Sequence, residues 1–181
     1  MKVYIASPGY NRGEREVNEE ISSALENGGF ETFLEHRDLP GYNDLKAALK
    51  TDHESKAREI AVRTMGGLKL VSYLRECQAA VINITGRTPD EGSVLVAGMA
   101  YTKCIPMVFY KSGSRTPLGG CESPLIEYLR LGRTVRNIPD IPGKLRDLIE
   151  QEKDDLEDVE GLLEVWRERG LEALVQEIKV S

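Results

Sequence analysis

Short apolar runs alternate with segments of helical spacing along most of the chain. Runs rich in β-branched, aromatic and aliphatic side chains occupy residues 2–7, 30–34, 79–84, 105–110 and 134–138. Helical patterns occupy residues 14–26, 44–63, 68–76, 93–103, 123–131 and 143–151. Strands that alternate with helices are typical of βαβ units. The pattern therefore predicts an α/β fold, a flavodoxin- or Rossmann-like parallel sheet flanked by helices.

The end of the chain has a different charge balance. Residues 151–181 contain ten acidic and four basic side chains, which accounts for the whole net charge of −6, so residues 1–150 are neutral overall. Apolar side chains recur in this segment at the spacing of one helix face: Leu156, Val159, Leu162, Leu163 and Trp166. We therefore predict an α/β domain over residues 1–150 and an acidic amphipathic helical extension over 151–181. The extension either packs on the body or binds a partner.

Composition excludes several classes of protein. The net charge of −6 argues against nucleic acid as a partner. No apolar stretch has the length of a membrane span, and the first residues lack the pattern of a signal peptide. The three cysteines, Cys77, Cys104 and Cys121, are widely spaced without a CxxC pair. We expect reduced thiols in a cytoplasmic protein, with no metal site, no cofactor and no membrane association.

Two loops that follow predicted strands form a candidate binding site. Ligands of doubly wound α/β proteins bind at the carboxyl ends of the strands, where the strand order reverses. The first loop offers a glycine and a stacking aromatic ring, and the second opens a helix whose free N–H groups suit a phosphate or a hydroxyl. The candidate ligand-binding residues are Ser7, Pro8, Gly9, Tyr10 and Asn11 in the first loop, and Asp90, Gly92 and Ser93 in the second. Alternatively, Gly9 is only a turn residue and Asp90 only a helix N-cap.

Three segments resemble one known family. The opening MKVYIASPGY, the segment LRECQAAVINI at residues 74–84 and PDEGSVLVAGMAY at residues 89–101 are similar to nucleoside 2-deoxyribosyltransferases. The last segment resembles their signature Asp-x-Gly-Thr-x-x-Glu-x-Gly-x-Ala, which it matches at Asp90, Gly92, Ser93, Gly98 and Ala100. The resemblance implies a flavodoxin-like domain, often a homo-oligomer, that binds nucleosides or nucleotides and breaks their N-glycosidic bond.

The chain departs from the family pattern where the chemistry takes place. In the family, the Glu of the signature is the nucleophile, and this chain has Val96 at that position. A second acid of the family falls on Leu70. Neither side chain can attack a sugar or move a proton, so deoxyribosyl transfer should be weak or absent. If another acid takes over, the weak candidates are Glu91, Glu122 and Glu127.

Three functions are compatible with these observations. The first is a nucleoside- or nucleotide-binding protein of this family with lost or altered catalysis. The second is an active deoxyribosyltransferase or nucleotide N-glycosidase that uses a relocated acid. The third is a structural or interaction module that acts through its C-terminal helix.

Overall fold

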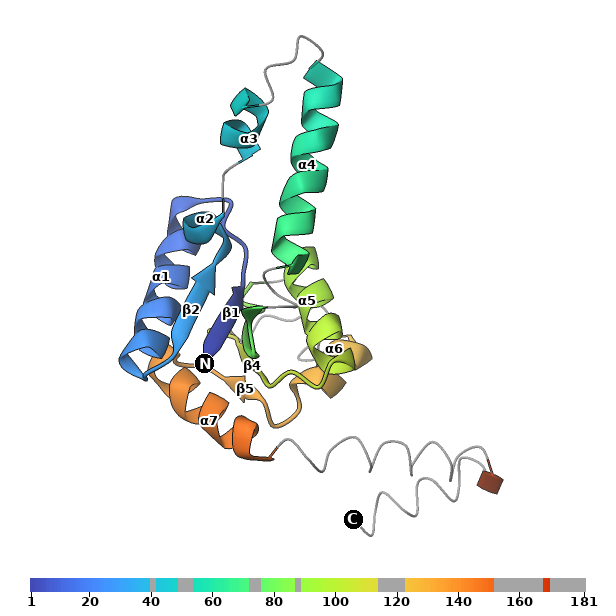
Figure 1. Cartoon of the computed structure of the whole chain (residues 1–181). Helices are drawn as coiled ribbons and strands as arrows, with labels where there is room; N and C mark the ends of the chain where they lie inside the picture. The colour runs from blue at the N-terminus through green and yellow to red at the C-terminus, as the bar shows by residue number, and fades with distance from the viewer. Residues whose placement is uncertain are drawn as a thin grey trace. The chain divides into compact units, whose positions relative to one another are not determined.

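The structure of the chain is a computed structural model (Figure 1). It describes residues 1–39, 42–48, 54–71, 76–86, 89–113, 123–151 and 168–169. Contacts between Cα atoms divide the chain into two units, Met1–Leu148 and Ile149–Ser181. Nearly all of the predicted acidic extension lies outside the described residues, so the helix at 151–181 and the boundary at residue 150 stay predictions.

The predicted parallel α/β sheet is confirmed. Its strands are β1 (Lys2–Ala6), β2 (Glu31–Leu34), β3 (Ala79–Asn83), β4 (Met107–Tyr110) and β5 (Thr134–Val135). They lie in the order β2-β1-β3-β4-β5, and every neighbouring pair is parallel. This is the order of flavodoxin-like proteins, whose ligand crevice lies at the ends of β1 and β3.

The helices follow the predicted order, with differences in the polar region. They are α1 (Arg12–Asn27), α2 (Glu35–Asp38), α3 (Tyr42–Ala48), α4 (Glu54–Val71), α5 (Glu91–Thr102), α6 (Pro124–Arg130), the 3₁₀ helix η2 (Ile138–Asp140) and α7 (Ile141–Gln151). The prediction of a break between residues 63 and 68 is wrong, because α4 continues through Gly66 and Gly67. Glycine inside a helix costs about 1 kcal/mol but does not prevent it.

The short helix α2 lies in a region between residues 34 and 44 where the sequence pattern predicts neither a strand nor a helix. It has no buried residue, so it carries no hydrophobic pattern. Polar contacts hold it instead: the Asp38 carboxylate accepts a hydrogen bond from the Leu34 amide at 2.8 Å and pairs with Arg37 at 2.8 Å. Residue 35 therefore directly follows the edge strand β2 at the start of a defined turn.

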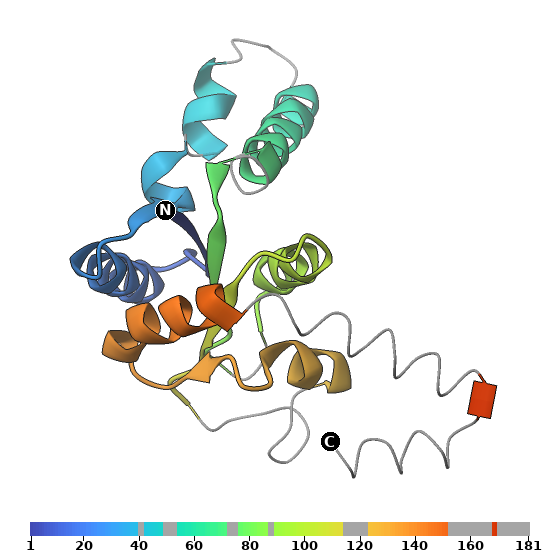
Figure 2. The same cartoon turned by 60° about the horizontal axis from the view of Figure 1, so that its bottom comes forward.

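Helices cover both faces of the sheet (Figure 2). On one face, Tyr4, Ile82 and Phe109 pack against Ala97 and Ala100 of α5, in a cluster that α6 completes. The small alanine side chains let α5 approach the strands closely. On the other face lie α1 and α7, which bury Ile21, Leu25, Ile141 and Leu145. No helix within the described ranges combines the length and the apolar character that crossing a membrane requires.

A capping box begins α1 directly after the first loop. The Asn11 side chain accepts a hydrogen bond from the Glu14 amide at 3.0 Å, and the Glu14 carboxylate accepts one in return from the Asn11 amide at 3.2 Å. The same carboxylate accepts from the Tyr10 amide at 2.8 Å. These bonds satisfy N–H groups that the first turn of a helix leaves unpaired. They also fix the path of the backbone through Tyr10.

The approach of α7 to α1 predicts that Gly28→Ala destabilises the protein. A Cβ atom at Gly28 would lie 2.8 Å from Cβ of Pro142, which belongs to a rigid ring at the start of α7. Overpacking of this kind costs about 1–3 kcal/mol. We expect the urea midpoint of unfolding to fall. The matched control is Gly67→Ala, where a Cβ atom meets nothing within 4 Å. It should instead stabilise α4 by up to about 1 kcal/mol, and equal effects of the two substitutions would contradict this packing.

Candidate functional site

A cavity of about 650 Å³ lies at the carboxyl ends of β1 and β2, beside the start of α5. We call it the switch-point cavity. Its volume is within the range of small-molecule sites. Its lining combines the loop after β1, one face of α1, the turn after β2, part of α4 and the first turns of α5. The lining residues include Tyr4, Ser7, Gly9, Tyr10, Arg15, Asn18, Glu35, His36, Leu39, Met65, Asp90, Gly92, Ser93, Leu95, Val96 and Met99.

Most of the predicted ligand-binding residues line this one cavity. They are Ser7, Pro8, Gly9, Tyr10, Asp90, Gly92 and Ser93. The fold brings the two loops together because β1 and β3 are neighbours and end at the same edge of the sheet. Asn11 does not line the cavity, since its side chain caps α1. Its amide oxygen therefore has a structural role in the chain as described.

A polar network holds the loop after β1 in place. The Ser7 hydroxyl donates a hydrogen bond to the Asn18 side chain and accepts one from the Asn83 amide group at 3.1 Å. The Asn18 amide group donates to the Pro8 carbonyl at 2.9 Å, and Arg15 donates to the Gly9 carbonyl at 3.0 Å. Asn18 and Asn83 are almost completely buried. The loop is therefore fixed by side chains from α1 and β3 without any ligand.

One hydrogen bond joins the two loops across the mouth of the cavity. The Tyr10 hydroxyl donates to the Asp90 carboxylate at 3.2 Å, and the tyrosine side chain remains 80% exposed. The nearby negative charge of Asp90, followed by partial burial, raises the pKa of the Tyr10 phenol above its usual value of 10. The phenol therefore stays protonated at neutral pH and keeps its hydrogen for donation.

Asp90 also caps α5. Its carboxylate accepts hydrogen bonds from the Ser93 amide at 2.9 Å and from the Ser93 hydroxyl at 3.0 Å. The Asp90 side chain is thus the N-cap of α5, as one of the two sequence interpretations proposed, and it also lines the cavity. Its position at the cavity and its capping bonds are compatible, because one oxygen serves Ser93 and the other serves Tyr10.

Val96 lies in the wall of the cavity and is 8% exposed. Residue 96 therefore presents only hydrocarbon to the cavity. Among the candidate replacement acids, Glu91 and Glu127 do not line the cavity, and Glu127 pairs with Arg130 at 2.6 Å. Glu122 and the Leu70 side chain lie outside what the structure describes.

Glu35 is a cavity acid that the sequence reasoning missed. Among the described residues, it and Asp90 are the acids in the cavity lining. Glu35 is the first residue of α2, and its carboxylate accepts a hydrogen bond from the Tyr4 hydroxyl. The available signal was its position at a strand end, the same criterion that selected Ser7 and Gly9. Its hydrogen-bond partner Tyr4 is distant in sequence, so no local pattern marks the pair.

Metal ligation finds no support in the described parts of the chain. No three side chains among His, Cys, Asp and Glu come together there in a group that could hold an ion. Burial raises the pKa of the Cys77 thiol to about 11, so this cysteine is a protonated core residue at neutral pH. Among the described residues, the polar groups of the cavity lining are carboxylates, hydroxyls, the Asn18 amide, the Arg15 guanidinium and the His36 imidazole.

Comparisons with known proteins point to one family. A family model described as nucleoside 2-deoxyribosyltransferase matches residues 3–152. A similar solved structure is a 2-deoxyribosyltransferase from Bacillus psychrosaccharolyticus, with 16% identity and a TM-score of 0.53 over 78% of this chain and 90% of that one. A conserved protein from Enterococcus faecalis V583 has 17% identity and a TM-score of 0.58 over 81% and 98% of the two chains. No curated protein matches significantly.

The double role of Asp90 leads to a prediction about stability. Asp90→Ala removes the N-cap of α5 and should lower the free energy of unfolding by about 1 kcal/mol. Asp90→Asn is the matched control, because asparagine caps a helix about as well as aspartate. We expect Asp90→Asn to unfold close to the wild-type urea midpoint. Equal losses in both variants would show that the negative charge, rather than the capping bond, stabilises this end of α5.

Proposed function

This chain belongs to the nucleoside 2-deoxyribosyltransferase family, and we propose that it binds a nucleoside or nucleotide in the switch-point cavity. The observation that carries the proposal is the convergence of the two predicted loops on this cavity, at the point where the strand order reverses. Ligands bind at this point in open α/β sheets in general. The two solved relatives support the fold, and their own ligands are not transferred to this chain.

The lining has the composition that a nucleoside requires. Tyr10 presents an exposed ring to the cavity mouth, on which a base can stack. Leu39, Met65 and Met99 supply apolar surface to cover the base. Asp90 and Ser93 provide an acceptor and a hydroxyl for sugar hydroxyl groups, and their mutual bonds hold them in position. Polar recognition is thus concentrated at one end of a mainly apolar cavity.

Charge favours a nucleoside over a nucleotide at the start of α5. The Asp90 carboxylate already accepts the Ser93 N–H group, and its negative charge opposes a phosphate there. A nucleotide phosphate would instead lie near Arg15, a cation of the lining that is anchored to the Gly9 carbonyl. The sugar hydroxyl groups would therefore bind at the Asp90 end of the cavity, and a phosphate would bind at the Arg15 end.

Catalysis through residue 96 is not part of this proposal. Val96 has no group that can form a bond to the sugar, and tighter binding alone does not lower a chemical barrier. Any N-glycosidic bond cleavage by this chain needs a carboxylate from another position. The binding function stands without it.

We also propose a homo-oligomer. Large apolar side chains on α5, on α6 and directly after α6 remain exposed: Leu95, which also borders the cavity, Leu125, Tyr128 and Leu131. Exposed apolar surface on neighbouring elements is typical of protein–protein contacts. Light scattering on the full chain measures the mass directly, and a monomer at micromolar concentration would contradict this part of the proposal.

The binding proposal is tested by calorimetry on the full chain. We expect heat of binding with 2′-deoxynucleosides, and a stabilisation of about 2.7 kcal/mol when the ligand is at a hundredfold excess over its Kd. Tyr10→Ala should weaken binding about tenfold or more, because base stacking contributes about 1–3 kcal/mol. The control is Arg12→Ala, an exposed side chain on α1 outside the cavity lining, which should keep the wild-type affinity. No binding of any nucleoside or nucleoside monophosphate at millimolar concentration would overturn the proposal.

A further inference from the structure

Val96 and Tyr4 lie in the same apolar cluster, between the sheet and α5, and both line the switch-point cavity. Tyr4 is 1% exposed and its ring stacks on Phe33 with centroids 5.4 Å apart. Its hydroxyl is therefore a donor that the packing of the ring holds in one position.

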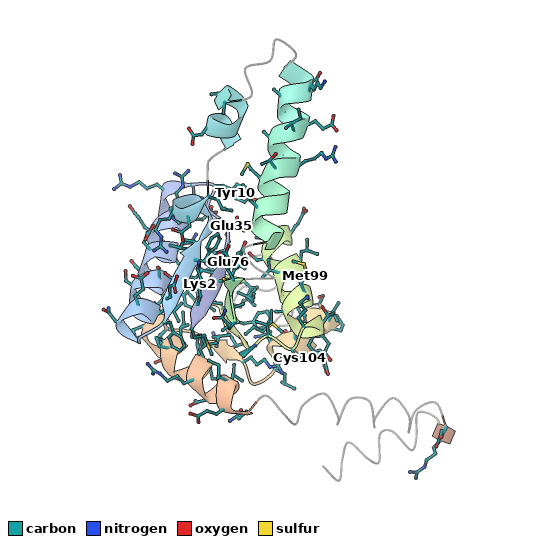
Figure 3. The ribbon with its side chains drawn as sticks, viewed as in Figure 1. Lys2, Tyr10, Glu35, Glu76, Met99 and Cys104 are labelled. Atoms are coloured by element: carbon teal, nitrogen blue, oxygen red, sulfur yellow. The ribbon has the colours of Figure 1, made fainter. Side chains whose placement is uncertain are left out.

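That donor binds a carboxylate from a different strand. Glu35 follows β2, and β2 pairs with β1 so that Leu34 lies opposite Ile5. This register brings residue 35 to the end of β1, where its carboxylate accepts the Tyr4 hydrogen bond. Figure 3 shows Glu35 next to Tyr10, where β1 and β2 end. The cavity lining thus contains a carboxylate that Tyr4 holds, although residue 96 does not supply it.

Asp90 is less suited to attack a ligand. Its two oxygens bind the Ser93 amide, the Ser93 hydroxyl and the Tyr10 hydroxyl. Glu35 is the half-buried first residue of α2 and is not its N-cap, which is Leu34. Its charge contributes to the raised pKa of the Tyr10 phenol, after the larger effect of Asp90. Two carboxylates therefore flank Tyr10 at one cavity, which is the number that glycoside chemistry uses.

We propose that Glu35 replaces the missing signature glutamate as the catalytic carboxylate, held by Tyr4, in cleavage of the N-glycosidic bond of a 2′-deoxynucleoside. This inference rests on the proposed nucleoside-binding function. A carboxylate oxygen of Glu35 forms a bond to C1′ while the C1′–N bond breaks. The bonding pair leaves with the base, which takes a proton from solvent.

Water then completes the reaction. It attacks C1′ and breaks the bond to Glu35, which regains its carboxylate, and one proton returns to solvent. The products are the free base and 2-deoxyribose, and no proton is gained or lost overall. A second free base in place of water would give deoxyribosyl transfer.

The first test separates binding from turnover. The full-length wild-type chain is incubated with individual 2′-deoxynucleosides, and free base is measured by chromatography beside calorimetric binding of the same compounds. We expect base release that Glu35→Gln lowers by about 100-fold or more, with the nucleoside Kd changed by less than about threefold. The matched control is Glu59→Gln on the exposed surface of α4, which should keep the wild-type rate.

The second test addresses Tyr4 as a positioning residue. Tyr4→Phe removes the hydroxyl and keeps the ring, so kcat should fall about tenfold or more while KM changes little. The control Tyr101→Phe removes a hydroxyl that lies 3.3 Å from the Tyr128 hydroxyl, outside the cavity lining, and should leave kcat unchanged. A purely structural role of Tyr4 would lower stability without this separation of kcat from KM.

The bond to the sugar is tested directly by mass spectrometry. A 2′-fluorinated deoxynucleoside slows loss of the sugar, and acid quenching should leave the fluorosugar on the peptide that contains Glu35. An adduct on another peptide, or base release without any adduct, overturns the covalent step. If Glu35→Gln does not fold, as judged by circular dichroism, Glu35→Asp and the adduct decide the question.

The outcomes separate the two proposals. Binding without base release overturns the role of Glu35 and leaves the chain a nucleoside-binding protein. Absence of binding overturns the proposed function and this inference together. Base release that Glu35→Gln leaves unchanged assigns the chemistry to another acid and overturns the inference alone.

Discussion

The reversal of strand order beside β1 is the constraint on which the site depends. From β1 the chain crosses to β2 on one side, and from β2 it returns past β1 to β3 on the other. Right-handed crossovers then place the intervening helices on opposite faces of the sheet. A crevice is left at the carboxyl end of β1, because no helix can cover the edge from which both connections depart. The loop after β1, the turn after β2 and the start of α5 all meet in this crevice.

Buried polar side chains convert this crevice into a fixed site. Asn18 on α1 and Asn83 at the end of β3 both bind Ser7, and they are almost completely buried. A buried amide without a partner is costly, so these side chains hold the loop in one conformation. The rigidity comes from three separate elements, α1, β1 and β3.

Much of the fold could be predicted from the sequence, because burial leaves a pattern in it. The central strands β3 and β4 are buried on both faces and appear as unbroken apolar runs, and α1 shows its buried face at helical spacing. The polar turn α2 leaves no such pattern, since it buries none of its residues. The continuous α4 was also missed, because Gly66 and Gly67 look like a stop signal when tertiary context is unknown.

The cavity could be predicted in part for the same reason. Loops that follow strands can be found in one dimension, which placed Ser7 and Gly9 beside Asp90. The contact between Tyr4 and Glu35 depends on the register between β1 and β2, which no local pattern contains. Asn11 was predicted to bind the ligand, but its side chain caps α1. The sequence cannot distinguish the two roles, because both use the same polar side chain.

Glu35 lies outside the hydrophobic core of the domain, whereas Val96 belongs to it. Residue 96 lies in α5, whose inner face packs on the sheet, so any change of size or charge there disturbs the core. Residue 35 lies in a surface turn that buries none of its own side chains. The charge and length of the other side chains of this turn can therefore vary with little cost in folding free energy, whereas residue 35 must keep an acceptor for the buried Tyr4 hydroxyl. In an engineering experiment, this turn is the part of the cavity wall where a library of side chains would sample new ligand preferences while the protein stays folded.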